Sequence, residues 1–239
     1  MKISTRLCEL FDDAAHHLAS VRDLWDSWDS DAVIKDATSG RYIDRHKLHT
    51  LHPNGRNFRP QGPSITPRPP QGQPIIAALA HAPIPYRLAV READIVFITP
   101  HSGSNVTRIL ADIDNIAQHH RPVEYLPIKT FVDLTVVVEG TGSSNRRRTS
   151  LDTHLTAPWT SDSLIFTGTA QELADLIEHW HALGIDSFRL RPAVLPTDLH
   201  RINDELVPIL QERNLRPQAA PDGTLRTRLG LPEPESRFR

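Results

Sequence analysis

The apolar run Ile75–Leu79 is followed by two side chains that can bind a polar ligand. They are the imidazole of His81 and the phenol of Tyr86. Both groups donate and accept hydrogen bonds, and an imidazole titrates near neutral pH. We therefore treat both residues as candidates for holding a polar or anionic group. The alternative for His81 is that its ring only faces solvent in a loop.

A second group follows the predicted strand Asp94–Ile98 and consists of Thr99, His101 and Ser102. Their hydroxyl and imidazole groups suit contact with a substrate or a cofactor. The alternative is that Ser102 and Ser104 only cap the next helix, because serine side chains accept hydrogen bonds from the free N–H groups at a helix start.

Arg189 and Arg191 form a third group at the end of a short predicted strand. Residues two apart lie on the same face of a strand. A guanidinium that leaves water needs a charged partner. We therefore expect either an anionic ligand or a carboxylate of the chain itself beside them. The loop Pro192–Asp198 that follows is a candidate for shaping a substrate pocket.

Other suggestive residues have simpler explanations. His46, His49 and His52 recur at regular spacing, but their proline-rich surroundings lack clustered acidic or cysteine ligands, so we predict no metal site. The run Arg146–Arg148 is interpreted as part of a solvated loop, with phosphate contact as the alternative. The sequence has no P-loop and no serine-hydrolase nucleophile motif.

The elements that position these groups alternate between strands and helices. A long helix over 1–28 comes first, and an irregular excursion over 29–73 follows, with a short hairpin around Asn54-Gly55. The predicted strands are Ile75–Ala80, Asp94–Thr99, Glu124–Val138 and Ser187–Leu190. The predicted helices are Tyr86–Ala93, one through Val106–Ala117, one capped by Thr169 and Glu172 and ended at Gly184, and one from Leu199 that Pro208 kinks or restarts. The segment Gly140–Trp159 is predicted to be irregular.

This order predicts an α/β fold with a parallel sheet and right-handed crossovers. We find about four strand-helix units, whereas a closed TIM-type barrel needs eight. The chain is therefore expected to form a partial TIM-type barrel. Such a sheet has two unpaired edges, which a homodimer, a complementary half-barrel or a rearranged N-terminal segment would cover.

Composition narrows the class of protein. A chain of 239 residues with 38% apolar content can bury one substantial core. Its formal net charge of -2 gives no reason to expect nucleic acid or an anionic membrane as a partner, and the apolar runs are too short to span a bilayer. Cys8 is the single cysteine, which excludes an internal disulfide and favours a reducing, cytoplasmic location.

Several motifs carry a family resemblance. They are LWDSWDSDAV (24–33), SGRYIDRHKLHTLHPNGRNFRPQGP (39–63), PRPPQGQPII (67–76), FTGTAQELADLIEHWHALGIDSFRLRPAVLPTDL (166–199), ERNLRP (212–217) and GTLRTRLGLPEPESRF (223–238). In this order they resemble the luciferase-like flavin-dependent monooxygenases, in the branch of the nitrilotriacetate and dibenzothiophene-sulfone monooxygenases. The resemblance implies an eightfold barrel of which this chain is the second half. We therefore expect a single domain over 1–239 that is truncated at its N-terminus, with βα units over 74–214 and a tail over 215–239.

The resemblance also implies a loop of the form Q-A-G-x-S-x-x-G that holds the phosphate of FMN. The matching frame here reads A-L-A-H-A-P-I-P, so Ala82 replaces the serine and Pro85 replaces the glycine. Hydroxyl and backbone donors are both reduced, and His81 and Tyr86 are the candidates to replace them.

The expected function follows from the same resemblance. It is that of an oxidoreductase, a monooxygenase that uses O₂ and reduced FMN from a separate flavin reductase to oxidise a small organic substrate. A deazaflavin is the alternative cofactor, and activity of the isolated chain is not expected. The alternative function is a non-catalytic flavin-binding remnant, or a partner subunit that completes another half-barrel.

Overall fold

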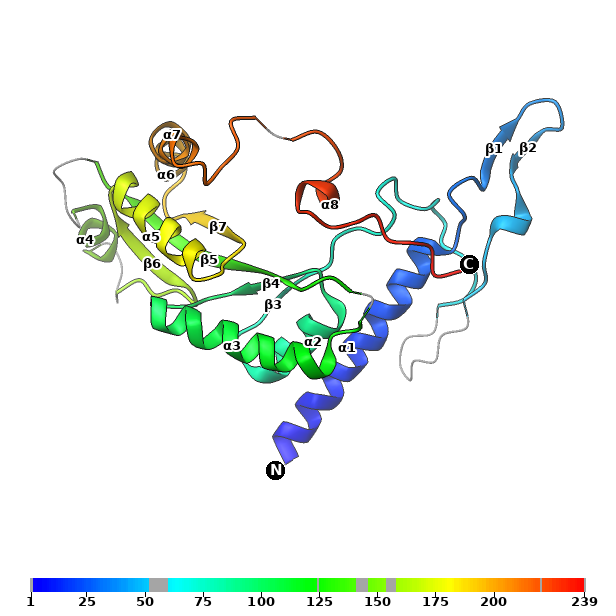
Figure 1. Ribbon diagram of the computed structural model, residues 1–239, viewed down its shortest axis with the longest axis horizontal. Coiled ribbons are helices and arrows are strands. Elements are labelled where there is room, and N and C mark those ends of the chain that lie inside the picture. The colour runs from blue at the N-terminus through cyan, green and yellow to red at the C-terminus, as the bar shows by residue number, and fades with distance from the viewer. Residues whose placement is uncertain are drawn as a thin grey trace.

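The computed structural model describes residues 2–51, 60–123, 125–140, 146–153, 158–219 and 221–238, with side chains from residue 6 onward. Helices and strands alternate along most of the chain (Figure 1). The helices are α1 Lys2–Asp26, α2 Pro83–Glu92, α3 Gly103–His120, α4 Arg146–Thr153, α5 Ala170–Ala182, α6 Thr197–Arg201, α7 Val207–Glu212 and α8 Leu225–Arg228. The strands are β1 Val33–Asp36, β2 Arg41–Ile43, β3 Ala77–Leu79, β4 Ile95–Ile98, β5 Lys129–Val138, β6 Leu164–Gly168 and β7 Ser187–Pro192.

Strands β3 to β7 form one five-stranded sheet in which every pair is parallel. The order of strands and helices from β3 onward confirms the predicted α/β alternation. Parallel strands are usually buried on both faces and are rich in apolar, β-branched residues. The run Val132–Val138 of β5 fits this rule, because every one of its residues is buried.

Three strands pair with β5. β4 pairs with its first part, Lys129–Val132, and β6 pairs with its last part, Leu134–Val138. β7 pairs along Phe131–Val136 and so overlaps both of them. A strand has only two edges, so β7 occupies one edge of β5 while β4 and β6 follow one another along the other. In the described residues β3 and β7 pair on one side only, and the sheet does not close into a barrel.

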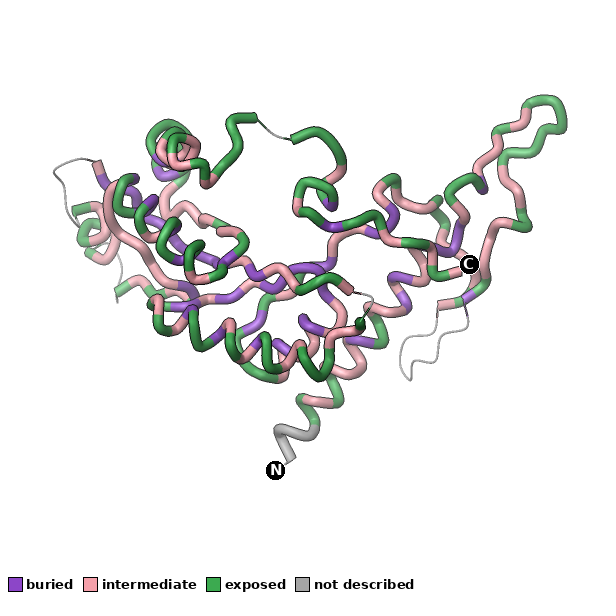
Figure 2. Tube along the Cα trace, viewed as in Figure 1, coloured by how far each residue is buried: buried purple, intermediate pink, exposed green. Residues whose placement is uncertain are grey.

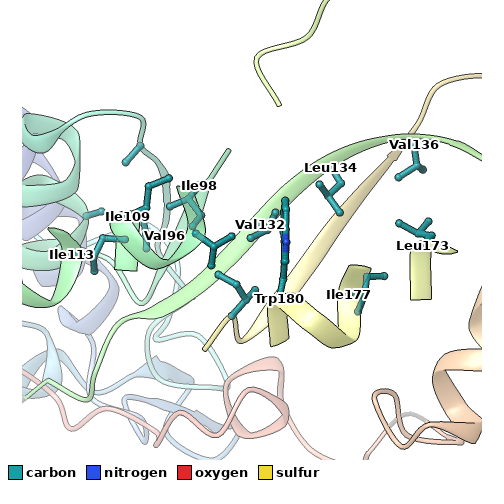
Figure 3. Packing of buried hydrophobic residues seen from close by; sticks show 14 of the residues in the cluster. Val96, Ile98, Ile109, Ile113, Val132, Leu134, Val136, Leu173, Ile177 and Trp180 are labelled. Atoms are coloured by element: carbon teal, nitrogen blue, oxygen red, sulfur yellow. The ribbon is translucent and has the colours of Figure 1, made fainter. Parts of the chain in front are cut away.

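Helices α2, α3 and α5 pack on one face of this sheet and build the core there (Figures 1 and 2). Figure 3 shows Val132 and Leu134 of β5 facing Trp180 and Ile177 of α5. Trp180 is only 1% exposed. The capping box of α5 is present as predicted, with Thr169 and Glu172 bonding each other's backbone N–H groups, which fixes where this helix starts.

The N-terminal part consists of α1 and a hairpin. The second half of α1 packs on the core through Leu18 and Trp25. Strands β1 and β2 form an antiparallel hairpin that projects from the body of the molecule (Figure 1). Gly40 has a φ of 67° in the turn, where a side chain would be strained. The hairpin that the sequence predicts around Asn54-Gly55 lies outside the described residues.

The last helical segment is interrupted near Pro208, as predicted. A π-helical turn, Ile202–Leu206, separates α6 from α7. Proline has no N–H to continue a helical ladder, but the N–H groups of a first turn have no partner within the helix. Pro208 is therefore tolerated in the first turn of α7. Among the described residues no helix combines the length and apolar character needed to cross a membrane.

The C-terminal segment returns to the amino ends of β3 and β4. Arg226 of α8 donates to Asp94, with Nη2 3.3 Å from Oδ1. Arg68 donates from Nε to Asp26 at 2.8 Å and from Nη2 to the carbonyl of Pro234 at 2.7 Å. Asp26 and Asp94 are buried, so these bonds satisfy charges that would otherwise be costly. The tail is therefore fixed to the end of α1 and to the sheet.

Candidate functional site

The sheet face that points away from the helices carries charged and aromatic side chains. Side chains alternate along a strand, so Asp133 points away from the core residues Val132 and Leu134. Residues on β4 and β7 with the same orientation lie beside it in register. We call this set the polar face; its members are Phe97, Phe131, Asp133, Thr135, Arg189 and Arg191.

Arg189 is paired with Asp133, its neighbour in register across β7 and β5. The Nε atom donates to Oδ1 at 2.5 Å, and Nη2 donates to Oδ2. The Asp133 side chain is fully buried, whereas that of Arg189 is 47% exposed. These bonds to the carboxylate raise the pKa of Arg189. A carboxylate of the chain, one of the two partners expected from the sequence, therefore lies beside Arg189.

An aromatic surface adjoins this pair. The Cζ atom of Arg189 lies 4.1 Å from the centroid of the Phe97 ring, a cation-π distance. The rings of Phe97 and Phe131 pack edge to face, with centroids 5.5 Å apart. A half-exposed guanidinium over an aromatic ring is a surface on which a planar, electron-rich ring system can stack.

Arg191 is held in a nest of hydroxyl groups. Its Nη2 atom lies 2.6 Å from Ser163 Oγ, 2.9 Å from Ser161 Oγ, 3.1 Å from Thr135 Oγ1 and 2.7 Å from Asp162 Oδ1. The hydrogen bond from Arg191 lowers the pKa of Asp162. Arg189 and Arg191 lie on one face, as predicted, and each has a carboxylate of the chain beside it.

His81 and Thr99 meet where β3 and β4 end. Leu79 and Phe97 are neighbours in register, so the residues two further along also face each other. His81 Nδ1 and Thr99 Oγ1 are 2.8 Å apart. If the Thr99 hydroxyl donates to Nδ1, the Nε2–H group of the neutral ring remains as a free donor. If Nδ1–H donates to the hydroxyl oxygen, the hydroxyl hydrogen remains as the free donor. Either arrangement leaves one donor for an external acceptor.

The start of α2 offers little to a phosphate. Its N-cap is Ala82, which makes no side-chain hydrogen bond, and Pro83 stands in the first helical position. Pro83 and Pro85 have no N–H, so this turn lacks donors that helix starts commonly present to anions. The part of the expected flavin site that would hold the phosphate at α2 therefore does not fit. The His81–Thr99 pair supplies the donors beside it.

Two other predicted site residues are not brought into this group. Tyr86 is 4% exposed and belongs to the hydrophobic core, where burial raises the pKa of its phenol. Its position on α2 places the ring in the core, so the structure does not bring this phenol together with the His81–Thr99 pair. His101 is exposed, and its backbone N–H donates to Asn105. Ser102 caps α3 by accepting from the Asn105 N–H, as the alternative reading predicts.

The prediction of an irregular Gly140–Trp159 segment is wrong for its centre, which forms α4. Arg147 donates from Nη1 to Asp198 at 2.5 Å and to the carbonyl of Val138 at 2.6 Å, and Glu139 accepts from its backbone N–H. Asp198 is 0% exposed. Arg147 therefore ties α4 to the carboxyl end of β5 and is not a solvated loop residue. Asp198 also accepts from the N–H of Val194, which shapes the loop after β7.

The sequence did not single out Asp133 or Phe97. An aspartate inside the apolar run of β5, two residues from Thr135 on the same face, is the signal that could have found Asp133, because a buried carboxylate demands a partner. Phe97 carries no comparable signal.

His49 takes a structural role, and His46 is exposed. His49 hydrogen-bonds Asp29 at 2.8 Å and stacks on Phe238, with ring centroids 4.9 Å apart. His52 lies outside the described residues. No group of three potential metal ligands occurs in the part of the chain that the structure describes.

An open parallel sheet with helices on one face and polar groups at its carboxyl ends is the architecture of part of an α/β barrel. The chain matches the long-chain alkane monooxygenase LadA with a TM-score of 0.77 at 22% identity, covering 93% of this chain and 61% of LadA. It is 28% identical to the dibenzothiophene-sulfone monooxygenase of Rhodococcus erythropolis over 94% of this chain and 64% of that protein. It is 30% identical to nitrilotriacetate monooxygenase component A of Aminobacter aminovorans over 56% of this chain and 30% of that protein.

These matches confirm the resemblance to the luciferase-like flavin-dependent monooxygenases and to the branch inferred from the motifs. The relatives that match most of this chain are longer than it is. The chain spans less than two thirds of their length, 64% in the case of the Rhodococcus protein. No family model matches the chain.

Proposed function

We propose that this chain is part of a flavin-dependent monooxygenase that inserts oxygen into a small organic substrate. The observation that carries the proposal is the similarity over 94% of the chain to a dibenzothiophene-sulfone monooxygenase. The arrangement of polar groups supports it, because ligands of parallel α/β folds bind where the strands end at their carboxyl side. His81, Thr99 and Arg191 all lie at that end.

The cofactor in this proposal is reduced FMN, with a deazaflavin as the alternative. A bound reduced flavin supplies the reaction with O₂, and the protein supplies position and exclusion of water. In this chain Phe97 and Arg189 would support the ring, and the His81–Thr99 pair would donate to an anionic or carbonyl oxygen. The poor donor set at Ala82 and Pro83 means that most of the phosphate contact must come from elsewhere.

The substrate in this proposal lies over the polar face near Thr99, Arg189 and Arg191, and His101 stays a candidate contact from the loop after β4. Because each guanidinium already has a carboxylate beside it, the face carries little excess positive charge. This favours a neutral or weakly charged organic molecule over a strongly anionic one. The half-exposed Arg189 uses two of its five N–H groups on Asp133 and keeps others for a further hydrogen bond.

The partner in this proposal is a flavin reductase that delivers reduced FMN. One relative is named component A of its monooxygenase, a name that implies at least one further component. A cytoplasmic location is part of the same proposal, since FMN reductases draw on intracellular nicotinamide cofactors and Cys8 is the only cysteine.

An oxygenation assay tests the proposal. The chain is combined with a flavin reductase, NADH, FMN and O₂, and product is measured with dibenzothiophene sulfone and nitrilotriacetate as probe substrates. A second series adds the part of the Rhodococcus relative that the chain does not match. Oxygenated product in either series, lost when FMN is omitted, supports the proposal. No product and no flavin binding in both series would overturn it.

A further inference from the structure

The start of α2 has few backbone donors for an anion. Of its first three residues, Pro83, Ile84 and Pro85, only Ile84 has an N–H group. The next N–H, that of Tyr86, is used within the helix, where it donates to the carbonyl of Ala82 at 3.0 Å. This first turn therefore offers at most one N–H group to a ligand, whereas helix starts that bind phosphate present several.

The start of α3, at the end of the neighbouring strand β4, uses its polar groups within the turn. Ser102 Oγ accepts from the N–H of Asn105 and lies 3.0 Å from Ser104 Oγ. The N–H of His101 donates to Asn105 Oδ1 at 3.1 Å. Using these groups on a phosphate would break the bonds that they make with one another.

The β7 side of the polar face is also unsuited to a strong anion. A phosphate monoester carries about −1.5 to −2 charges at pH 7. Arg191 is already paired with Asp162 at 2.7 Å, and the Asp162 side chain is 48% exposed. Arg189 is paired with Asp133. A phosphate here would meet an exposed carboxylate, and both arginines of the polar face are already neutralised by carboxylates.

Neutral hydroxyl groups suit the same surface better. The His81–Thr99 pair keeps one donor for an outside acceptor, and the exposed carboxylate of Asp162 accepts from outside donors. A hydroxyl both donates and accepts, so a chain of hydroxyl groups can satisfy both kinds of partner. Riboflavin carries such a chain on its planar ring system, and it differs from FMN only by lacking the phosphate.

We propose that the polar face binds a flavin without recognising its phosphate, so that riboflavin is bound at least as tightly as FMN. The ring stacks on Phe97 and Arg189. The hydroxyl chain lies along the carboxyl ends of the strands, where His81, Thr99 and Asp162 supply its partners. The inference rests on the proposed function for the presence of a flavin, and it adds which flavin this chain prefers.

Fluorescence titration of the 239-residue chain with riboflavin, FMN and lumiflavin tests the preference. Lumiflavin has the ring but neither the hydroxyl chain nor the phosphate. We expect a Kd for riboflavin equal to or below that for FMN, and a Kd for lumiflavin about tenfold higher, since it loses the hydrogen bonds of the hydroxyl chain. FMN bound more tightly than riboflavin would overturn the inference, as would lumiflavin bound as tightly as riboflavin.

One variant restores donors at α2. Pro83→Ala combined with Pro85→Ala returns two N–H groups to the first turn of this helix, and should make FMN bind about tenfold more tightly relative to riboflavin. Pro208→Ala is the matched control, because it makes the same change in the first turn of α7. An unchanged ratio of the two Kd values in the double variant would contradict the role assigned to the α2 prolines.

A second variant removes the exposed carboxylate. Asp162→Asn leaves the Arg191 guanidinium without a charged partner, and should also shift the preference toward FMN about tenfold. Asp112→Asn is the matched control, since Asp112 is 45% exposed and pairs with Arg108 at 3.1 Å on α3. Thermal unfolding checks that all variants fold. Equal preferences in Asp162→Asn and Asp112→Asn would contradict the role assigned to Asp162.

The outcomes separate this inference from the proposed function. Riboflavin bound as tightly as FMN, with no oxygenated product in the assay of the proposed function, would contradict the monooxygenase proposal alone. A clear preference for FMN together with oxygenated product would contradict this inference alone. Binding of neither flavin would contradict the inference whether or not product forms.

Discussion

Arg189 and Asp133 face each other across β7 and β5, with the carboxylate fully buried and the guanidinium 47% exposed. The pair therefore has an asymmetric energetic role. Asp133 needs Arg189, because a buried charge without a partner is costly, whereas Arg189 would be solvated without Asp133. This explains how a charged residue is tolerated inside an otherwise apolar strand and why the free side of the guanidinium remains available.

Replacing Arg189 should destabilise the fold more than replacing Arg191. Arg189→Met leaves the Asp133 carboxylate buried and unpaired, and we expect a loss of about 2 kcal/mol in the free energy of unfolding. Arg191→Met removes the partner of Asp162, whose side chain is 48% exposed and can be solvated. The loss in the free energy of unfolding for this variant should therefore stay below about 1 kcal/mol. Urea denaturation of both variants measures the difference. Equal losses would show that Asp133 is stabilised by something other than Arg189.

Trp180 should be the largest single contributor on α5 to the core. The ring is 1% exposed and faces Val132 and Leu134 in Figure 3. Trp180→Ala is expected to cost about 3 to 5 kcal/mol through lost burial and the cavity left behind. Leu195→Ala, at a position that is 69% exposed, should change the free energy of unfolding by less than about 0.5 kcal/mol. A small effect at Trp180 would contradict the packing of α5 on the sheet.

Local signals predicted much of this fold. The T-x-x-E sequence at Thr169 and Glu172 fixed the start of α5, and Gly184, with φ of 111°, fits the predicted end of that helix. Helix α4 was missed because its sequence has almost no apolar face; Arg147 holds it through Asp198, which is distant in sequence. Local patterns carry no information about such long-range ion pairs.

The capping box of α5 should make stability depend on pH in the acid range. The Thr169 backbone N–H donates to Glu172 and lowers the pKa of that carboxyl from its ordinary value of 4.5. A lowered folded pKa gives stability that is present above 4.5 and lost as the pH falls through the lowered value. The unaltered chain should therefore have a higher free energy of unfolding than the Glu172→Gln variant at pH 7. The two free energies should converge at acid pH.

Chemical denaturation between neutral and acid pH measures this convergence. Glu212→Gln, at an exposed position of α7, controls for the loss of one negative charge. A stability difference between the chain and Glu172→Gln that stays constant down to strongly acid pH would contradict the capping role.

The candidate site was predictable only in part. Position at the carboxyl ends of strands selected His81 and Thr99, and strand periodicity placed Arg189 and Arg191 on one face. The partners of these arginines could not be predicted, since they depend on the register of β5 with β7. Tyr86 was expected on the first turn of a helix from its sequence position alone, and the rotation of α2 buries its ring in the core.

The His81–Thr99 pair should act as one unit in ligand binding. His81→Ala and Thr99→Val each remove one partner, and each should weaken FMN binding about tenfold, the effect of one lost hydrogen bond to a charged group. The double variant should lose little more than either single variant, because the two residues share one interaction. Isothermal titration of the three variants tests this, and fully additive losses would mean that the residues act independently.

Titration of FMN fluorescence tests the central claim most directly, with the chain alone and with the polypeptide that comprises the unmatched part of the Rhodococcus relative. The account predicts saturable quenching in at least one of these samples, weakened by His81→Ala and unchanged by His119→Ala at the far end of α3. No quenching in either sample, or equal quenching by the two histidine variants, would contradict the assignment of a flavin site to this end of the sheet.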